Sequence, residues 1–254
     1  MDVANKVAVV TGSSAGVGRA TAEHLAALGA SVVVNYTHSE SDADEEVAGI
    51  RGAGGTAHAK QADIGDEAQC RALIRDAVDT YGGIQILVNN AGATHFIDHA
   101  DLEAVTSEVW SDIMSVNVEG AFNCTRAATP HMREAGEGAV VNVSSVAGLG
   151  GGGGSSIPYA ASKSALITMT KSLARVLGPE IRVNCIAPGF ITGRWLHGGL
   201  GEETYEAAKA NLTARSPLRN VATPETCADG ILAFIQHHTF STGQTIVVDG
   251  GAAL

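Results

Sequence analysis

Short apolar runs alternate with longer amphipathic stretches along the whole chain, and this pattern restricts the fold more than any other feature. The runs predict strands at 7–11, 31–36, 56–62, 86–89, 139–144, 182–187 and 245–248. The stretches predict helices at 17–28, 42–51, 67–81, 107–135, 159–177, 203–212 and 224–235. Such alternation implies right-handed crossovers. We therefore expect an α/β fold in one domain over residues 1–254, with a doubly wound parallel sheet of about seven strands flanked by helices.

Composition narrows the classes of partner. Hydrophobic residues make up 45% of the chain and aromatic residues only 4%, so the core is expected to be built from Val, Ile, Leu and Ala. The 27 acidic and 16 basic residues give a net charge of -11, which argues against nucleic acid and anionic membrane. No segment reaches the ~20 apolar residues of a membrane helix, and residues 1–10 lack the pattern of a signal peptide.

Cysteine and histidine spacing predicts no metal site. The four cysteines lie far apart and match no metal or redox motif, so structural thiols in a reducing cytoplasm are the simplest interpretation. His95 and His99, like His237 and His238, have no cysteine or carboxylate near them at ligand spacing, which favours surface histidines.

A glycine-rich turn joins the first predicted strand to the first predicted helix. It reads Thr11-Gly12-Ser13-Ser14-Ala15-Gly16-Val17-Gly18. Glycines there allow positive φ and let the backbone approach a pyrophosphate, and the helix N-terminus offers free N–H groups to the phosphates. An ordinary tight turn is the alternative. The position at the first strand-to-helix junction favours a dinucleotide site.

Tyr159 and Lys163 are four residues apart and share one face of a predicted helix. A tyrosine has a pKa near ~10 and is a poor acid or base at neutral pH. A nearby positive charge favours the phenolate and lowers that pKa, which would make Tyr159 usable for proton transfer. Taken alone, this spacing is also typical of a solvated pair on an ordinary helix.

Six motifs in sequence order resemble those of the short-chain dehydrogenase/reductase family, from Lys6 to Gly251. They are the glycine turn, Asn89-Asn90-Ala91-Gly92, Asn117 within Val116-Asn117-Val118-Glu119-Gly120, Ser145, the pair Tyr159 and Lys163, and Pro188-Gly189. The resemblance covers essentially the whole chain. It implies a Rossmann-type fold and an oxidoreductase that transfers hydride between a nicotinamide and a ketone or secondary alcohol.

The resemblance also implies roles for four catalytic residues. Tyr159 would be the acid/base, and Lys163 would lower its pKa and bind the nicotinamide ribose. Ser145 would polarise the substrate oxygen, with Ser144 as the fallback. Asn117 would hold a helix kink and a water that links Lys163 to solvent; its alternative is a polar helix residue bonding its own backbone.

Further residues are implied as cofactor contacts. Asp63 and Ile64 would contact the adenine, the Asn90 segment the adenosine ribose, and the Pro188 segment the nicotinamide carboxamide. The full implied set is Gly12, Ser14, Gly16, Val17, Gly18, Tyr36, Thr37, His38, Asp63, Ile64, Asn90, Ala91, Gly92, Tyr159, Lys163, Pro188, Gly189, Ile191 and Thr192.

The end of the second strand favours NADP(H) over NAD(H). An acid there would bind the ribose 2′-hydroxyl and repel a 2′-phosphate, but this chain has Tyr36-Thr37-His38-Ser39. NADP enzymes of the family often carry a basic residue in the glycine turn, where this chain has Ala15. NADP(H) is therefore favoured, and NAD(H) remains possible.

The substrate side carries less information. Residues 193–212 would form a variable lid, and Trp195 would either line the substrate space or pack the lid shut. The glycine run 150–154 would be an adaptable pocket wall or a plain surface loop. Thr94, His95, Ile157 and Phe190 are expected to face the substrate, and none of them carries a charge that would indicate an anionic substrate. We expect a free small-molecule carbonyl or alcohol, because the acidic chain suits an acidic carrier protein poorly.

The sequence leaves two alternative functions open, and the resemblance also implies an oligomeric state. A 3-oxoacyl-carrier-protein reductase is the alternative within the family, and a non-catalytic dinucleotide-sensing protein is the alternative from another class. The resemblance implies a homotetramer assembled through the helices predicted at 107–135 and 159–177. The closing apolar strand Ile246-Val247-Val248 would support a second interface.

Overall fold

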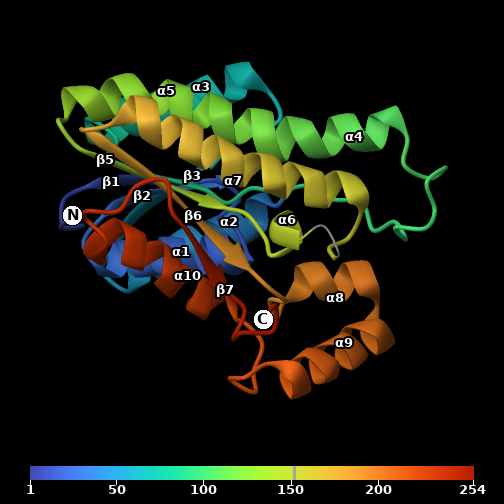
Figure 1. Cartoon of the computed structure of the whole chain (residues 1–254). Helices are drawn as coiled ribbons and strands as arrows, with labels where there is room; N and C mark the ends of the chain where they lie inside the picture. The colour runs from blue at the N-terminus through green and yellow to red at the C-terminus, as the bar shows by residue number, and fades with distance from the viewer. Residues whose placement is uncertain (151–152) are drawn as a thin grey trace.

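A computed structural model describes residues 1–150 and 153–254, and its centre is a seven-stranded parallel sheet (Figure 1). The strand order is β3-β2-β1-β4-β5-β6-β7. The strands are β1 Val7–Val10, β2 Ser31–Tyr36, β3 Thr56–Gln61, β4 Ile86–Asn89, β5 Gly138–Val143, β6 Ile181–Pro188 and β7 Thr245–Val248. The expected doubly wound α/β fold is confirmed.

Helices cover both faces of the sheet. The helices α1 Gly16–Ala27, α2 Glu40–Gly52 and α10 Pro224–Leu232 lie on one face, the last continued by the π-helical turn η2 Ala233–His237. The other face carries α3 Glu67–Tyr81, α4 Ser107–Met114, the π-helical turn η1 Ser115–Gly120, α5 Ala121–Glu134 and α7 Ile157–Leu177. Three further helices, α6 Ala147–Gly150, α8 Arg194–Leu200 and α9 Glu202–Arg215, lie near the carboxyl ends of the strands.

Alternation along the strands builds two apolar cores. In β1 and β2, Val10 and Val34 pack with the α1 and α10 side chains, whereas Val9 and Val33 pack with those of α3. Because successive side chains of a strand point to opposite faces, an apolar run is buried on both sides only when helices cover both faces. This explains why the central strands lack the polar alternation of a half-exposed sheet.

The helix expected at 107–135 is not one continuous α-helix. It consists of α4, the π-helical η1 and α5. Within η1, a Cβ atom at Gly120 would lie 2.3 Å from the carbonyl oxygen of Ile64, so a glycine lets this helix approach the loop that precedes α3. The sequence also missed α8, and α9 extends beyond the helix expected at 203–212.

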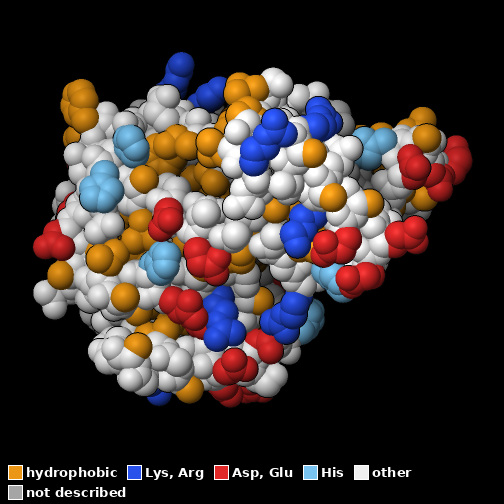
Figure 2. Space-filling model, turned by 90° about the horizontal axis from the view of Figure 1, so that it is seen from below, with side chains coloured by type: hydrophobic (Ala, Val, Ile, Leu, Met, Phe, Trp, Pro, Cys, Tyr) orange, Lys and Arg blue, Asp and Glu red, His pale blue; other side chains and the backbone are white. Residues whose placement is uncertain are grey.

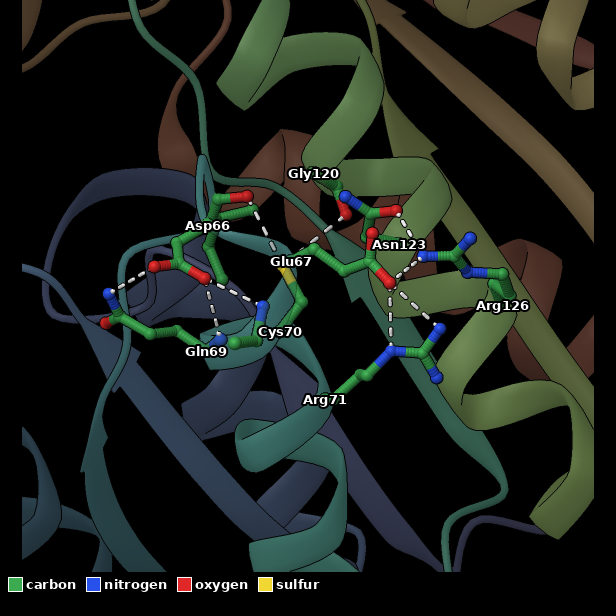
Figure 3. Close-up of polar contacts among 10 residues, drawn as sticks. Asp66, Glu67, Gln69, Cys70, Arg71, Gly120, Asn123 and Arg126 are labelled. Atoms are coloured by element: carbon green, nitrogen blue, oxygen red, sulfur yellow. Dashed lines mark hydrogen bonds and ion pairs between the residues drawn. The ribbon is translucent and has the colours of Figure 1, made fainter.

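Polar contacts fix α3 against α5 (Figure 3). Asp66 caps α3 by accepting hydrogen bonds from the backbone N–H groups of Ala68 and Gln69. Glu67 lies between Arg71 of its own helix and Arg126 of α5 and forms ion pairs with both. The two helices are thereby tied together beside the η1 turn.

The sheet positions a binding site where its topology reverses. The chain winds outward from β1 through β2 to β3, then returns to β4 on the other side of β1. In such sheets the crevice at the carboxyl ends of the strands, at the switch point, is where ligands bind. No helix in the described residues is both long and apolar enough to span a membrane.

Candidate active site

A cavity of about 1380 Å³ opens at the carboxyl ends of the strands. It brings together most of the residues that the sequence singled out. From that set, the lining contains Gly12, Gly16, Val17, Thr37, His38, Asp63, Ile64, Asn90, Ala91, Gly92, Ser145, Tyr159, Lys163, Pro188, Gly189, Ile191 and Thr192. Ser14, Gly18, Tyr36 and Asn117 are not part of the lining.

Tyr159 and Lys163 project from the first turns of α7. Ser156 caps this helix by accepting the Tyr159 N–H at 3.4 Å, and Pro158 lies in its first turn, where no N–H is needed. The Lys163 Nζ atom lies 5.5 Å from the centroid of the Tyr159 ring and donates a hydrogen bond of 2.9 Å to the carbonyl oxygen of Val143. Helix spacing and the end of β5 together set this geometry.

Of the two serines that follow β5, Ser145 is placed to work with Tyr159. Its side chain lies close enough to lower the pKa of Tyr159, and both residues line the cavity. The Ser144 hydroxyl instead donates to the backbone carbonyl of Lys163 at 2.8 Å, and this serine is buried. Ser144 therefore holds α7 against the end of β5, and Ser145 is available to a substrate oxygen.

Burial, and not the lysine charge, dominates the protonation of this pair. Burial raises the pKa of Tyr159 to about 12, and the contact with Ser145 only partly offsets that rise. Burial also lowers the pKa of Lys163 to about 8. Desolvation disfavours the charged form of each group. The sequence led us to expect a lowered tyrosine pKa; in the structure, burial raises it.

Asn117 lies behind the cavity and connects three segments. Its side-chain oxygen accepts the Ala93 N–H at 2.7 Å, and its amide donates to the Ala93 carbonyl and to the Ser162 hydroxyl of α7. The residue belongs to the π-helical η1, which interrupts the α-helix expected at 107–135. Asn117 therefore binds partners outside its own helix, unlike an ordinary polar helix residue.

The glycine turn has the features of a phosphate cradle. Gly12 and Gly16 both have positive φ, and a Cβ atom at Gly12 would lie 3.0 Å from the Ala91 Cα. The N-terminus of α1 has no side-chain cap and no acidic residue in its first turn, so its free N–H groups and dipole suit a pyrophosphate. Gly18 serves packing, because a Cβ atom there would lie 2.5 Å from the Gly12 carbonyl oxygen.

Asn90 supports this turn from the neighbouring strand. Its side-chain amide donates to the carbonyl oxygens of Thr11 and Gly12, each at 2.9 Å. The Thr11 hydroxyl in turn accepts the N–H groups of Asn90 and Ala91. Asp63 is exposed at the cavity, where one of its oxygens accepts the Gly65 N–H at 2.8 Å. These residues fit a dinucleotide whose adenosine lies at the carboxyl ends of β2 and β3.

The adenosine end holds a cation that the sequence analysis missed. The glycine turn itself has Ala15 and no basic residue, but Arg19, in the first turn of α1, lines the cavity. Its Nε atom lies 2.7 Å from the buried carboxylate of Glu46 and 3.2 Å from that of Glu23. One helical turn separates positions 15 and 19, which is the signal that could have found it. Tyr36 is buried nearby at the end of β2.

The opposite end of the cavity is lined by aromatic and apolar side chains. The Trp195 ring lies 6.2 Å from the Tyr159 ring and 5.9 Å from the Phe96 ring, measured between centroids. His95 and Asp112 also line this end and contact each other at 3.2 Å. The sequence analysis did not single out Phe96 or Asp112. In the glycine run, Gly153 and Gly154 line the cavity, and residues 151–152 lie outside the described residues.

Residues 193–215 cover the cavity next to the sheet. Arg194 of α8 reaches α2 and contacts Asp42 at 2.9 Å. In α9, the buried Tyr205 packs on Phe190 with ring centroids 5.2 Å apart, and its hydroxyl accepts the Gly193 N–H. The segment expected to be a variable lid is thus two short helices anchored at both ends.

Comparisons with known proteins agree with this geometry. A family model described as "Enoyl-(Acyl carrier protein) reductase" matches residues 12–253. The "Granaticin polyketide synthase putative ketoacyl reductase 2" of Streptomyces violaceoruber is 43% identical over 248 residues, covering 98% of this chain and 96% of that protein. The 3-oxoacyl-acyl-carrier-protein reductase FabG of Staphylococcus aureus is 36% identical over 249 residues, covering 97% of both.

A solved structure of similar fold is also described as a short-chain dehydrogenase/reductase. The crystal structure of a "putative short-chain dehydrogenase/reductase" from Burkholderia xenovorans superimposes with a TM-score of 0.89. It is 35% identical in sequence, and the match covers 98% of each chain.

Proposed function

The chain belongs to the short-chain dehydrogenase/reductase family of NAD(P)(H)-dependent oxidoreductases, and we propose that it reduces a free, uncharged ketone with NADPH. The observation that carries the proposal is the arrangement of Ser145, Tyr159 and Lys163 at one end of a cavity whose other end is a phosphate cradle. A cofactor and a carbonyl substrate can therefore meet beside the tyrosine.

The protein's own groups perform the proton chemistry. The bound nicotinamide supplies hydride for reduction and accepts it for oxidation. Tyr159 donates its phenolic proton to the carbonyl oxygen, while the Ser145 hydroxyl holds that oxygen in place. Lys163 positions the cofactor ribose, and Asn117 fixes the Ala93 loop against α7. The Tyr159 phenol, whose pKa is raised by burial, carries the proton that reduction requires.

Two features support NADP(H). No acid occupies the end of β2, where Thr37 and His38 line the cavity, and Arg19 supplies a guanidinium at the same end. Glu23, Glu45 and Glu46 surround this arginine and balance part of its charge, which is compatible with some use of NAD(H).

Charge around the cavity mouth supports a free substrate. The sequence has no Lys or Arg between Arg75 and Arg126, and the exposed acids of α4 and the loop before it are Asp98, Asp101, Glu103, Glu108 and Asp112. Figure 2 shows acidic side chains gathered where the loop before α4 protrudes, and no broad basic area on this face. An acidic carrier protein would meet like charge at this loop, which lowers both the affinity and the association rate.

A 3-oxoacyl-carrier-protein reductase is the second candidate. The printed names of the relatives favour it, because they describe ketoacyl and acyl-carrier-protein reductases. The discriminating measurement is kcat/KM for acetoacetyl-carrier protein against free ketones. A far higher value for the carrier-bound substrate would reverse our ranking.

The same proposal includes an assembly and a location. We infer a homotetramer built through α4, α5 and α7, whose outer surface exposes Trp110, Phe122 and Val176. The free and buried state of all four cysteines supports a cytoplasmic location. We also infer that residues 1–254 act as one catalytic domain and that 193–212 serve as its lid.

The activity is tested directly by following oxidation of NADPH and of NADH over a panel of uncharged ketones. We expect turnover with NADPH and a lower kcat/KM with NADH. Calorimetric binding of NADH tighter than that of NADPH would contradict the cofactor assignment. Turnover with neither cofactor over the whole panel would contradict the ketone-reductase assignment.

A further inference from the structure

Three aromatic rings form a connected wall at the substrate end of the cavity. Phe96 comes from the loop after β4, Trp195 from α8 and Tyr159 from α7. The centroid of the Trp195 ring is 5.9 Å from that of Phe96 and 6.2 Å from that of Tyr159, and both pairs are tilted. The wall therefore begins at the catalytic tyrosine and extends away from it.

The Phe96 ring occupies space that is free because residue 199 is a glycine. A Cβ atom at Gly199 would lie 2.0 Å from Cε2 of Phe96, so only a residue without a side chain leaves room for the ring. Gly199 and Trp195 are four residues apart on α8 and share a face of that helix. Helix α8 therefore presents the Trp195 ring and a seat for the Phe96 ring side by side.

Large parts of both rings remain uncovered. Trp195 is 51% exposed and Phe96 is 37% exposed, although both line a cavity. The neighbouring lining residues Val146, Ala147, Leu196, Leu200 and Leu212 are also apolar. An apolar ligand that covers this surface gains free energy roughly in proportion to the area it removes from water.

The charged groups at this end are already engaged with one another or with the backbone. His95 contacts Asp112, Arg194 contacts Asp42, and the Lys163 ammonium donates to the Val143 carbonyl. Among the described lining residues, no further Lys or Arg lies beside the rings. A carboxylate or phosphate on the substrate would have to compete with Asp42 for the Arg194 guanidinium.

Resting on the proposed ketone-reductase function, we propose that the substrate carries a planar aromatic or conjugated ring system next to its carbonyl group, and that Trp195 and Phe96 form the face that binds it. The carbonyl oxygen lies between Tyr159 and Ser145, and the fused or attached ring extends along the wall. Trp195 is then a specificity-determining residue rather than only a lid contact.

A matched pair of ketones tests the proposal. In 2-tetralone and 2-decalone the ketone occupies the same position of a saturated ring, and only the second ring differs, aromatic in one and saturated in the other. Stacking of the aromatic ring favours 2-tetralone by about 2- to 12-fold beyond simple burial. We expect W195L to lower kcat/KM for both ketones through the lost apolar contact, and to lower the value for 2-tetralone by about 2- to 12-fold more than that for 2-decalone.

Two comparisons separate this role from a lid role. W110L changes the only other tryptophan, which lies on α4 outside the cavity lining, and should leave the ratio of the two kcat/KM values unchanged. A Trp195 that acted only to close the lid would, when replaced, lower kcat/KM for both ketones equally and weaken NADPH binding. That equal loss would overturn the proposal.

A binding measurement separates this inference from the proposed function. In the W110F variant Trp195 is the only tryptophan, so its fluorescence reports the ring wall. We expect 2-tetralone to change this emission saturably in the cofactor-loaded enzyme, and 2-decalone to change it much less. If that holds while neither ketone is reduced, the ring site stands and the ketone-reductase assignment fails. If both ketones are reduced and the W195L variant leaves their ratio unchanged, the assignment stands and the ring site fails.

Discussion

At the scale of single residues, burial shifts the pKa values of Tyr159, Lys163 and Glu46 more than any neighbouring charge does. Tyr159 is a buried phenol whose pKa is raised to about 12, and Lys163 is a buried amine whose pKa is lowered to about 8. Burial likewise raises the pKa of Glu46, the buried carboxyl that pairs with Arg19. The spacing of Tyr159 and Lys163 could be read from the sequence, but their desolvation could not, because it depends on how tightly β5 and α7 pack around them.

The first residue-scale prediction concerns Tyr159→Phe. Removing the phenolic hydroxyl takes away the proton donor, and positioned acids contribute about 10²- to 10⁴-fold to rate. We expect kcat for ketone reduction to fall by that factor. NADPH affinity, measured by calorimetry, should stay within about threefold of the wild-type value, since the ring remains in place. Turnover at the wild-type rate would rule out Tyr159 as the proton donor.

The second prediction concerns the pH dependence of stability through Glu46. Burial, followed by the charge of Glu23, raises the pKa of this carboxyl to about 7 against the influence of Arg19. The folded state therefore retains a proton that the unfolded state has lost above the usual carboxyl pKa of 4.5. The stability associated with this proton is full below that value and is lost as the pH rises through about 7.

Glu46→Gln removes this dependence. We expect Tm to rise by about 2–4 °C at about pH 8, which corresponds to roughly 1 kcal/mol in a chain of this size, and to change less at about pH 5. Glu45→Gln is the matched control, because the Glu45 side chain is 72% exposed. An equal change of Tm at both pH values would show that Glu46 is not the titrating group.

At the scale of elements, the sequence predicted well what depends on local pattern. The seven strands and the helices α1, α3, α7 and α10 lie within a few residues of their expected positions, because short apolar runs mark the strands and helical periodicity marks the helices, of which α3, α7 and α10 also begin at a capping residue. The π-helical η1 could not be predicted, because it depends on Gly120 meeting the Ile64 carbonyl across the fold. Helix α8 carries two glycines, which mask its helical pattern, and it is held in place by Phe96 and Asp42 from elsewhere in the chain.

The same limit applies to the site. Gly12 and Gly16 of the glycine turn, with Asn90, Ser145, Tyr159 and Lys163, follow from motifs and spacing, and all line the cavity. Phe96 and Asp112 belong to no motif. They reach the cavity only because the loop after β4 and the start of α4 lie beside α8 and α7.

The element-scale prediction compares two adjacent glycines of α8. G199A would place a Cβ atom within 2.0 Å of the Phe96 ring, so the ring or the helix must move. G198A meets nothing within 4 Å and should only favour the helix, by about 1 kcal/mol. We expect kcat/KM for ketones to fall at least about tenfold in G199A and to change less than about twofold in G198A. Equal activities would show that Phe96 does not depend on this seat.

At the scale of the whole molecule, α4 and α5 each expose a large aromatic side chain. Trp110 is 38% exposed and Phe122 is 40% exposed. Large apolar patches on a soluble surface mark interaction sites. These side chains and the proposed tetramer are mutually consistent.

The assembly prediction is that light scattering at micromolar concentration gives a mass of about 103 kDa, four times the chain mass of 25.8 kDa. Phe122→Asp places a charge in the proposed interface and should reduce the mass to that of a dimer or monomer. Leu102→Asp, at a 65% exposed position in the loop before α4, is the control and should leave the mass unchanged. A monomer mass for the unmodified protein would refute the tetramer.

The acidic loop beside the cavity mouth also discriminates between ligands by their charge before they bind. Its exposed acids, from Asp98 to Asp112, create a field that extends about one Debye length, which is about 10 Å at 0.1 M salt. A keto acid would be slowed during diffusional encounter, whereas an uncharged ketone of the same size would not. Raising the ionic strength should therefore increase kcat/KM for the keto acid and leave that of the ketone nearly constant. Identical salt responses would contradict this. In a mixture of metabolites, discrimination against anions then operates through the association rate, before any contact with the aromatic wall.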